Sequence, residues 1–248
     1  MNPPTVIKVG GNDLAAPGFT DQLAATVYDL SQEEPCILVH GGGRSITDLM
    51  ARLGIEPVYV DGQRITDEAT LEAAEMILSG RVNKDLVAAL LAAGVDALGM
   101  SGVDRGLLRV KPWAEDMGLV GRIVAVRVEV LEELCGSGVV PVISPISLGP
   151  AGRYNVNADH AAGAIARAVE AAQAVFVTNV PGVKVGDEVM PVLSAEETRR
   201  LVEQGTIHGG MIPKVEAALA ALESGVRQAR ITDLPGLQAG TGTVLVSE

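Results

Sequence analysis

Residues 5–11 read TVIKVGG, so a short β-branched run leads directly into two glycines. A second run of this kind, CILVHGGG at residues 36–43, ends in three glycines, and a helical pattern follows it at residues 44–53. Buried strands that alternate with helices across glycine turns are typical of parallel βαβ units. The two runs therefore predict an α/β protein built around a mainly parallel sheet.

The rest of the chain continues this alternation. Residues 107–110 and 122–130 differ, because polar and apolar residues alternate there as in an antiparallel ribbon with one solvated face. No internal repeat or long linker interrupts the chain, so we expect two lobes that share one continuous sheet, with a soft boundary near Ala171. Further helices are expected at residues 19–30, 67–78 (capped by Thr66), 83–92, 158–171, 195–203 and 213–222, and further strands near 96–100 and at 139–144, 175–178, 227–232 and 243–246.

Composition excludes several classes of protein. With 31 acidic and 19 basic residues the formal net charge is -12, which opposes a general affinity for nucleic acid or anionic membranes. No apolar stretch approaches the roughly 20 residues that span a bilayer. The two cysteines, Cys36 and Cys135, lack the spacing of a zinc site or a disulfide scaffold. We therefore expect a cytoplasmic protein that acts on small molecules and has no metal site of its own.

Lys8 and the glycines that follow the first two strands form a candidate anion site. A lysine in an apolar strand is poorly placed unless its ammonium group faces an anion, although an exposed strand edge would also accept it. The HGGG run at residues 40–43 exposes backbone N–H groups at the positive end of a helix, where phosphate or carboxylate oxygens bind well. A tight turn without a ligand is the alternative.

Three further side chains extend this interpretation. Lys214 follows Pro213 in the first turn of an expected helix, where a cation is unfavourable unless it faces an anion or is solvated. Asp159, in the NVNAD run at residues 155–159, either satisfies the helix dipole or holds two lysines through charge-assisted hydrogen bonds. Either asparagine of that run is a candidate N-cap. Arg64 either clamps a substrate carboxylate or lies free in solvent.

Other kinds of site lose support. Neither a P-loop nor a dinucleotide-binding fingerprint occurs in the chain. The GMSG run at residues 99–102 misses the G-x-S-x-G pattern of serine hydrolases by one residue. His40, His160 and His208 lack the spacing of a transition-metal site.

The chain resembles the acetylglutamate kinases of the amino acid kinase family in five motifs that occur in the same order. They are KVGG at residues 8–11, HGGG at 40–43, GQRIT at 62–66, NVNAD at 155–159 and GMIPK at 210–214. The similarity spans nearly the whole chain. It implies a three-layer αβα sandwich around a mainly parallel central sheet. An N-terminal lobe, residues 1–171, would bind the acylamino acid and dimerise, and a C-terminal lobe, residues 172–248, would bind ATP.

The resemblance implies a kinase that transfers the γ-phosphoryl group of ATP to the γ-carboxylate of N-acetyl-L-glutamate, giving N-acetyl-L-glutamyl 5-phosphate and ADP in arginine biosynthesis. A carboxylate is already an anionic nucleophile near neutral pH, so the protein has mainly to bring two anions together and disperse charge on the transferred group. Lysines, helix N-termini and Mg²⁺ bound to the ATP oxygens would supply the positive field. A homodimer is the simplest expected assembly.

The resemblance also assigns roles to individual residues. Lys8 and Lys214 would stabilise the transferred phosphoryl group, and Asp159 would position both lysines. The acylamino acid would contact Gly42, Gly43, Arg64 and Asn155, and Gly11 would lie beside the phosphates. The nucleotide would contact Asn179, Val180, Pro181, Gly182, Val183 and Lys184, together with Thr206, Ile207 and His208.

Asn179 departs from the family pattern, which usually has an aspartate before Val-Pro-Gly. An asparagine there is similar to the related kinases that phosphorylate carrier-protein-linked aminoadipate or glutamate in lysine biosynthesis. The third glycine of HGGG and the NVNAD run favour a free small substrate, as does the scarcity of basic clusters beyond residues 105–111. A non-catalytic nucleotide-binding regulatory module is a second alternative, against which the presence of Lys8, Lys214 and Asp159 argues.

Overall fold

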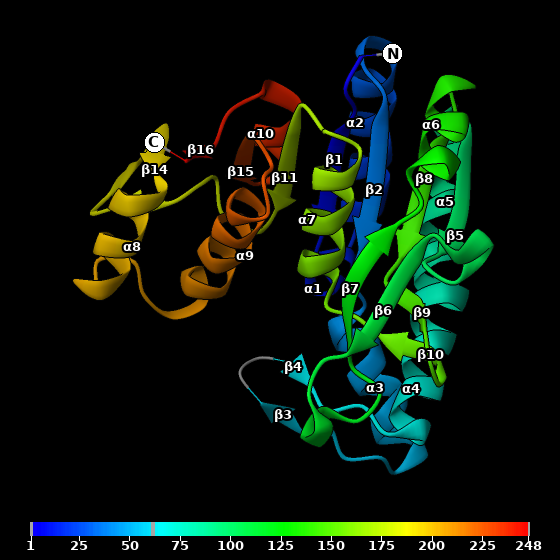
Figure 1. The fold of residues 1–248 in the computed structure, drawn as a ribbon. Helices are drawn as coiled ribbons and strands as arrows, with labels where there is room; N and C mark the ends of the chain where they lie inside the picture. The colour runs from blue at the N-terminus through cyan, green and yellow to red at the C-terminus, as the bar shows by residue number, and fades with distance from the viewer. Residues whose placement is uncertain (1, 61–62, 248) are drawn as a thin grey trace.

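The centre of the molecule is a sheet of eight strands, seen in a computed structural model that describes residues 2–60 and 63–247 (Figure 1). The strands are β1 (Thr5–Val9), β2 (Cys36–His40), β5 (Ala97–Ser101), β8 (Val140–Ser144), β11 (Gln173–Val177), β14 (Val192–Ser194), β15 (Gln228–Thr232) and β16 (Thr243–Val246). Their order is β14-β16-β15-β11-β1-β2-β8-β5, and neighbours are parallel except β15 and β16. Lys8 therefore lies on a central strand, opposite Phe176 on one side and Val39 on the other.

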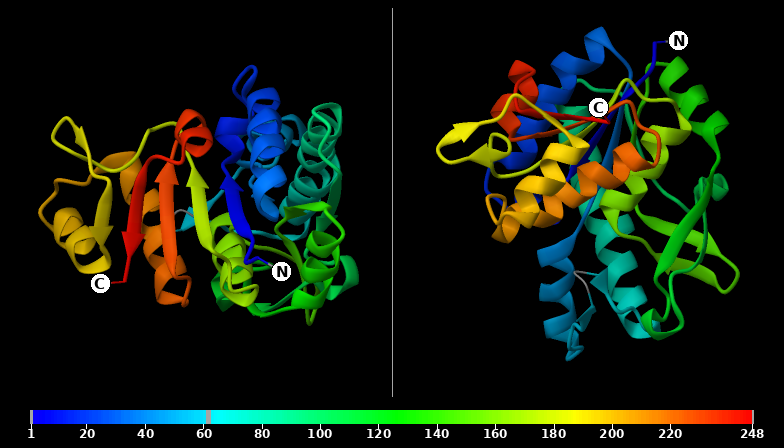
Figure 2. Two further views of the ribbon diagram at one scale, coloured as in Figure 1. Left: turned by 90° about the horizontal axis from the view of Figure 1, so that it is seen from above. Right: turned by 60° about the vertical axis from the view of Figure 1, so that its left-hand side comes forward.

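Helices cover both faces of this sheet, so the molecule has three layers (Figure 2). The helices are α1 (Gly11–Leu14), α2 (Phe19–Glu33), α3 (Gly43–Leu53), α4 (Glu68–Glu75), α5 (Asn83–Ala92), α6 (Val128–Gly136), α7 (Ala158–Ala168), α8 (Ala195–Glu203), α9 (Ile212–Glu223) and α10 (Leu234–Ala239). Val6 packs in the core beneath α6 to α9, whereas Ile7 packs in the core beneath α2 to α5 and α10. The predicted three-layer fold and the continuous sheet are thus confirmed.

A smaller sheet of four strands lies beside α7, in the order β10-β9-β6-β7. Its strands are β6 (Leu108–Pro112), β7 (Gly121–Val126), β9 (Ile146–Gly149) and β10 (Gly152–Asn155). Strands β6 and β7 form the predicted antiparallel ribbon. Residues 122–130 are not one strand as predicted, because β7 ends at Val126 and α6 begins at Val128.

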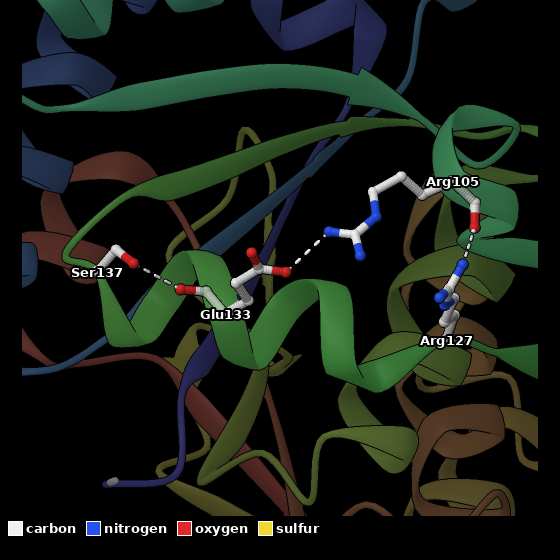
Figure 3. A network of polar contacts seen from close by, with 4 residues as sticks. All are labelled: Arg105, Arg127, Glu133 and Ser137. Carbon is white, nitrogen blue, oxygen red and sulfur yellow. Dashed lines mark hydrogen bonds and ion pairs between the residues drawn. The ribbon is translucent and has the colours of Figure 1, made fainter.

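Tertiary contacts decide the structure of α6. Val130 and Leu131 are neighbours in the sequence, and both are buried in the same core. Neighbouring residues of a strand would point to opposite faces, so a helix is needed to bury both on one side. Figure 3 shows how the exposed side of α6 is held: Glu133 accepts a hydrogen bond from Nη1 of Arg105 at 2.8 Å. The main-chain oxygen of Arg105 accepts another from Nη1 of Arg127 at 3.0 Å.

The helix expected at residues 67–78 also differs from the prediction. Asp67, not Thr66, is the N-cap of α4, since its Oδ1 accepts a hydrogen bond from the N–H of Thr70 at 2.7 Å. The chain continues after α4 as a π-helix, Met76–Val82, which leads into α5. This type of helix is rare and often occurs near functional sites.

Two short hairpins complete the fold. They are β3 (Tyr59–Val60) with β4 (Gln63–Arg64), and β12 (Lys184–Val185) with β13 (Glu188–Val189). Neither hairpin, nor α10, was expected from the sequence. Gly62 of the GQRIT motif lies outside the described residues. None of the described helices is both long and apolar enough to cross a membrane.

Candidate active site

Two glycine loops meet at the carboxyl ends of β1 and β2. A Cβ atom added to Gly11 would lie 2.3 Å from the N atom of Gly43, and one added to Gly42 would lie 2.9 Å from Cδ2 of Leu78. A side chain is therefore excluded at Gly11, where the contact is with backbone, whereas one at Gly42 would require the Leu78 side chain to move. Helix α3 begins at Gly43, and no described side chain caps it, so its first N–H groups are available to an anionic ligand.

Lys8 and Asp159 form an ion pair beside these loops. The Nζ of Lys8 lies 2.8 Å from Oδ1 of Asp159, and 15% and 27% of the two side chains are exposed. Asn157 is the N-cap of α7: its Oδ1 accepts a hydrogen bond from the N–H of Asp159 at 2.7 Å. The cap of α7 thereby fixes the start of the helix from which the carboxylate projects.

Two cavities meet at this ion pair, since Lys8, Gly43 and Asp159 line both. The Arg64 cavity has a volume of about 240 Å³, and the Lys214 cavity has a volume of about 460 Å³. The Arg64 cavity is also lined by Gly41, Gly42, Ile46, Tyr59, Gln63, Arg64, Leu78, Val120, Pro145, Asn155, Val156, Asn157 and Ala158. The Lys214 cavity is also lined by Gly10, Gly11, Asn12, Asp13, Phe176, Val177, Thr178, Pro213 and Lys214.

Arg64 and Lys8 both line the Arg64 cavity, and Arg64 is the cation of the two that has no carboxylate partner in the part of the chain that the structure describes. Its guanidinium group lies 4.7 Å from the centre of the Tyr59 ring, and its Nη2 donates to Oγ1 of Thr47 at 3.0 Å. Only 9% of the residue is exposed, and burial lowers its pKa. It makes no ion pair with any carboxylate of the described residues. Because a buried cation is costly without a partner, this group suits an anionic ligand.

Asn155, the last residue of β10, also lines the Arg64 cavity. Its Nδ2 donates to Oγ1 of Thr66 at 3.1 Å. This hydrogen bond joins β10 to the segment that follows Arg64. The structure thus brings together the four residues that were predicted for the acylamino acid, namely Gly42, Gly43, Arg64 and Asn155.

Lys214 occupies the first turn of α9 and lines the other cavity. Burial lowers its pKa; Asp13 opposes that shift and Lys8 adds to it. Its Nζ donates to Oδ1 of Asn179 at 2.6 Å. Asp159 was expected to position both lysines, but in the described residues it pairs only with Lys8. Asn179 holds Lys214 instead.

Asp13 and Asn12 are site residues that the sequence analysis missed. Both line the Lys214 cavity. Burial raises the pKa of the Asp13 carboxyl, although Lys214 and Lys8 oppose the shift. The sequence signal that could have identified them is their position directly after the KVGG run, at the carboxyl end of β1, the strand that carries Lys8.

The other residues predicted for the nucleotide lie on the loop after β11, on β12 and before α9. Val183 and Ile207 are buried, with 0% and 2% of each whole residue exposed, so neither presents a surface to a ligand in this structure. Lys184 and His208 are exposed. Two members of this set are hydrogen-bonded to residues that line the Lys214 cavity: Asn179 to Lys214, and the backbone of Val180 to the Thr178 hydroxyl.

Comparison with known proteins gives the family. Residues 3–233 match a model of the Amino acid kinase family. The chain belongs to this family. Among curated members, the "Acetylglutamate kinase" of Roseiflexus sp. (strain RS-1) is 56% identical over 249 residues, covering 99% of this chain and 94% of the relative. The "Acetylglutamate kinase" of Methanopyrus kandleri is 45% identical over 252 residues, covering 97% and 99%.

A solved structure of this amino acid kinase fold agrees over the whole chain. The crystal structure of smu.665 from Streptococcus mutans UA159 superposes with a TM-score of 0.86 at 26% identity, covering 99% of each chain. In this fold the Lys8–Asp159 ion pair lies where several elements converge. These elements are the carboxyl ends of β1 and β2 and the N-termini of α3, α7 and α9.

Proposed function

We propose that this amino acid kinase transfers the γ-phosphoryl group of ATP to the γ-carboxylate of N-acetyl-L-glutamate, giving N-acetyl-L-glutamyl 5-phosphate and ADP in arginine biosynthesis. The observation that carries the proposal is the meeting of two cavities at Lys8, Gly43 and Asp159. Such an arrangement suits a reaction between two bound anions. The names of the curated relatives support the same acceptor.

In this proposal the Arg64 cavity binds the acceptor. Arg64 would bind the α-carboxylate of the acylamino acid, and Asn155 would hydrogen-bond its amide. The γ-carboxylate would then lie near Gly42 and Gly43. The carboxylate needs no general base, so positioning and charge stabilisation supply the rate enhancement.

The Lys214 cavity would receive the phosphates. Lys8 and Lys214 approach it from opposite lobes, residues 1–171 and 172–248, and would stabilise the negative charge of the transferred group. Asp159 would keep the Lys8 ammonium group in place, and Asn179 would do the same for Lys214. Gly11 would let the phosphates approach the backbone.

Mg²⁺ would enter bound to ATP and neutralise charge on its phosphate oxygens. The described residues hold no group of three or more His, Cys, Asp and Glu side chains that could bind an ion. The Asp13 carboxylate lines the Lys214 cavity and would be the protein group that holds the nucleotide-bound Mg²⁺, since such ions commonly use one or two carboxylates together with substrate phosphates and water.

We further propose that the kinase acts as a cytoplasmic homodimer. Strand β5 lies at the edge of the central sheet, and Leu98 on it is 45% exposed. An exposed strand edge can pair with other chains and so cause aggregation, and a dimer that covers β5 would prevent this. Sedimentation velocity of the purified protein tests the assembly.

The decisive experiment is a hydroxamate trap for acyl phosphate. The protein is incubated with Mg-ATP and, in turn, N-acetyl-L-glutamate, N-acetyl-L-aspartate, L-glutamate and N-acetyl-aminoadipate. Hydroxamate with N-acetyl-L-glutamate alone is the expected result. Product with N-acetyl-aminoadipate but not with N-acetyl-L-glutamate would favour the lysine-pathway kinase, and bound ATP without any product would favour the regulatory module.

A further inference from the structure

His40, the last residue of β2, is a buried residue for which the proposed function has no role. None of it is exposed, and its ring lies on the side of the sheet covered by α3, α4 and α5. Its Nδ1 lies 3.2 Å from the carbonyl oxygen of Gly41. Its Nε2 lies 3.1 Å from Nδ2 of Asn83. A carbonyl oxygen only accepts hydrogen bonds, so Nδ1 carries the proton of a neutral imidazole.

Asn83 fixes the same tautomer from the other side of the ring. It is fully buried at the junction of the π-helix and α5. Its Nδ2 donates to the carbonyl oxygen of Val142 at 2.8 Å, and its Oδ1 accepts from Nζ of Lys84 at 2.9 Å. These two partners orient the amide with its N–H groups toward His40. The Nε2 of His40 is therefore the acceptor.

This chain of hydrogen bonds ends on the peptide that joins Gly41 to Gly42. In a trans peptide the C=O and the following N–H point to opposite sides. Because the Gly41 carbonyl faces the imidazole, the Gly42 N–H lies on the far side of the peptide. Within the described chain, neither the Gly42 N–H nor the Gly43 N–H has a hydrogen-bond partner, and both glycines line the Arg64 cavity.

We propose that His40 is a positioning residue, which holds the Gly41–Gly42 peptide so that the Gly42 N–H faces the oxygens of the reacting carboxylate and phosphoryl group. The inference rests on the proposed kinase function. Glycine has no Cβ to restrain its backbone, so this peptide needs an external restraint. If the peptide turned over, it would present a carbonyl oxygen to two anions instead of a donor.

Two substitutions separate positioning from structure. His40→Phe keeps the ring but removes the donor to Gly41, so the Gly42 N–H is no longer held toward the reacting groups, and we expect kcat to fall by about 100-fold, the usual effect of losing one donor to a developing anion. His40→Asn places an amide N–H close to the position of Nδ1 and should restore much of the lost kcat. The KM for N-acetyl-L-glutamate should change less than kcat in both variants.

Ser79→Ala is the matched control. It removes a partly buried hydrogen bond, between Oγ of Ser79 and Oγ of Ser144 at 2.7 Å, and leaves Gly41 untouched. We expect it to lower the melting temperature and leave kcat unchanged. Equal losses of kcat in Ser79→Ala and His40→Phe would overturn the proposal, because general destabilisation would then explain both.

Nuclear magnetic resonance tests the same proposal without turnover. In protein labelled with ¹⁵N-histidine, His40 should be neutral and protonated on Nδ1 at pH 7. Addition of a non-hydrolysable ATP analogue with N-acetyl-L-glutamate should shift the Gly42 amide proton strongly downfield in the wild type and not in His40→Phe. An Nε2–H tautomer, or equal Gly42 shifts in both proteins, would overturn the positioning role. A hydroxamate trap negative with every acceptor would instead refute the proposed function.

Discussion

The ammonium group of Lys8 lies 2.8 Å from the carboxylate of Asp159, at the point where the two cavities meet. We expect Lys8→Met to lower kcat by about 10² to 10³, because it removes a charge directed at the transferred group. Steady-state hydroxamate assays measure the effect. Lys111→Met, on the exposed ribbon, is the control and should leave kcat unchanged. Unchanged turnover in Lys8→Met would refute the assigned role.

Arg64 gives a prediction about acceptor binding. Arg64→Lys keeps the charge but loses the planar fork that binds a carboxylate with two hydrogen bonds. We expect the KM for N-acetyl-L-glutamate to rise by about tenfold to a hundredfold, as for the loss of a hydrogen bond to a charged group, with the KM for ATP little changed. Arg153→Lys, an exposed arginine paired with Glu75, serves as control. A rise confined to the KM for ATP would contradict the assignment.

The contact between the glycine loops gives a third prediction. Gly11→Ala should strongly reduce both stability and activity, because its Cβ would lie 2.3 Å from the backbone N of Gly43 and force the loops apart. Gly80→Ala should be harmless, since no atom lies within 4 Å of the added Cβ. Thermal melts and kcat of the two variants provide the comparison. Similar behaviour would show that the loops separate at little cost.

Lys214 should set the alkaline limit of activity. Burial lowers its pKa, and the ammonium form is required, so kcat/KM should fall as pH rises through that lowered pKa. Asn179→Asp would place a carboxylate at the oxygen that now lies 2.6 Å from Nζ, raise the pKa and move the alkaline limb to higher pH. Asn179→Gln, a neutral change, should not move it upward. If the alkaline fall in kcat/KM occurred at the same pH in the wild type, Asn179→Asp and Asn179→Gln, Lys214 would be excluded as the titrating group.

His40 should make stability depend on pH. Burial lowers its pKa to about 4, whereas an unfolded histidine titrates near 6.5. As pH falls from about 6.5 to 4, the unfolded chain takes up a proton that the folded protein does not, so the free energy of unfolding should drop by roughly 3 kcal/mol. Chemical denaturation across this range measures it. The same series with His40→Asn should lack this part of the slope.

Much of the candidate site was predictable because its residues follow strand ends. The KVGG and HGGG runs place Lys8 and the glycines at the carboxyl edge of adjacent parallel strands, which fixes their proximity once the fold class is known. The hydrogen-bond partner of Lys214 was not predictable, since the resemblance assigned Asp159 to both lysines. Asp159 belongs to the NVNAD motif whereas Asn179 departs from the family pattern, and only the packing of α7 and α9 shows that Asp159 meets Lys8 and Asn179 meets Lys214.

The elements that sequence reasoning missed depend on distant contacts. Residues 128–130 read VEV, which alternates like a strand, but burial of Val130 and Leu131 makes them helical. Asn83 looked like an ordinary polar residue at a helix start. Its role depends on Val142 and His40, which lie far away in the sequence.

The central position of β1 has a consequence for synthesis of the chain. This strand is synthesised well before one of its two neighbours, β11, because Thr5 pairs with Gln173. At usual translation rates, roughly 10 to 30 s pass before that partner has been made. During this time the nascent chain exposes an apolar, unpaired strand edge. The Lys8–Asp159 ion pair and the Lys214 cavity also depend on segments that are synthesised long after β1, so the site is complete only once α7 and α9 have been made.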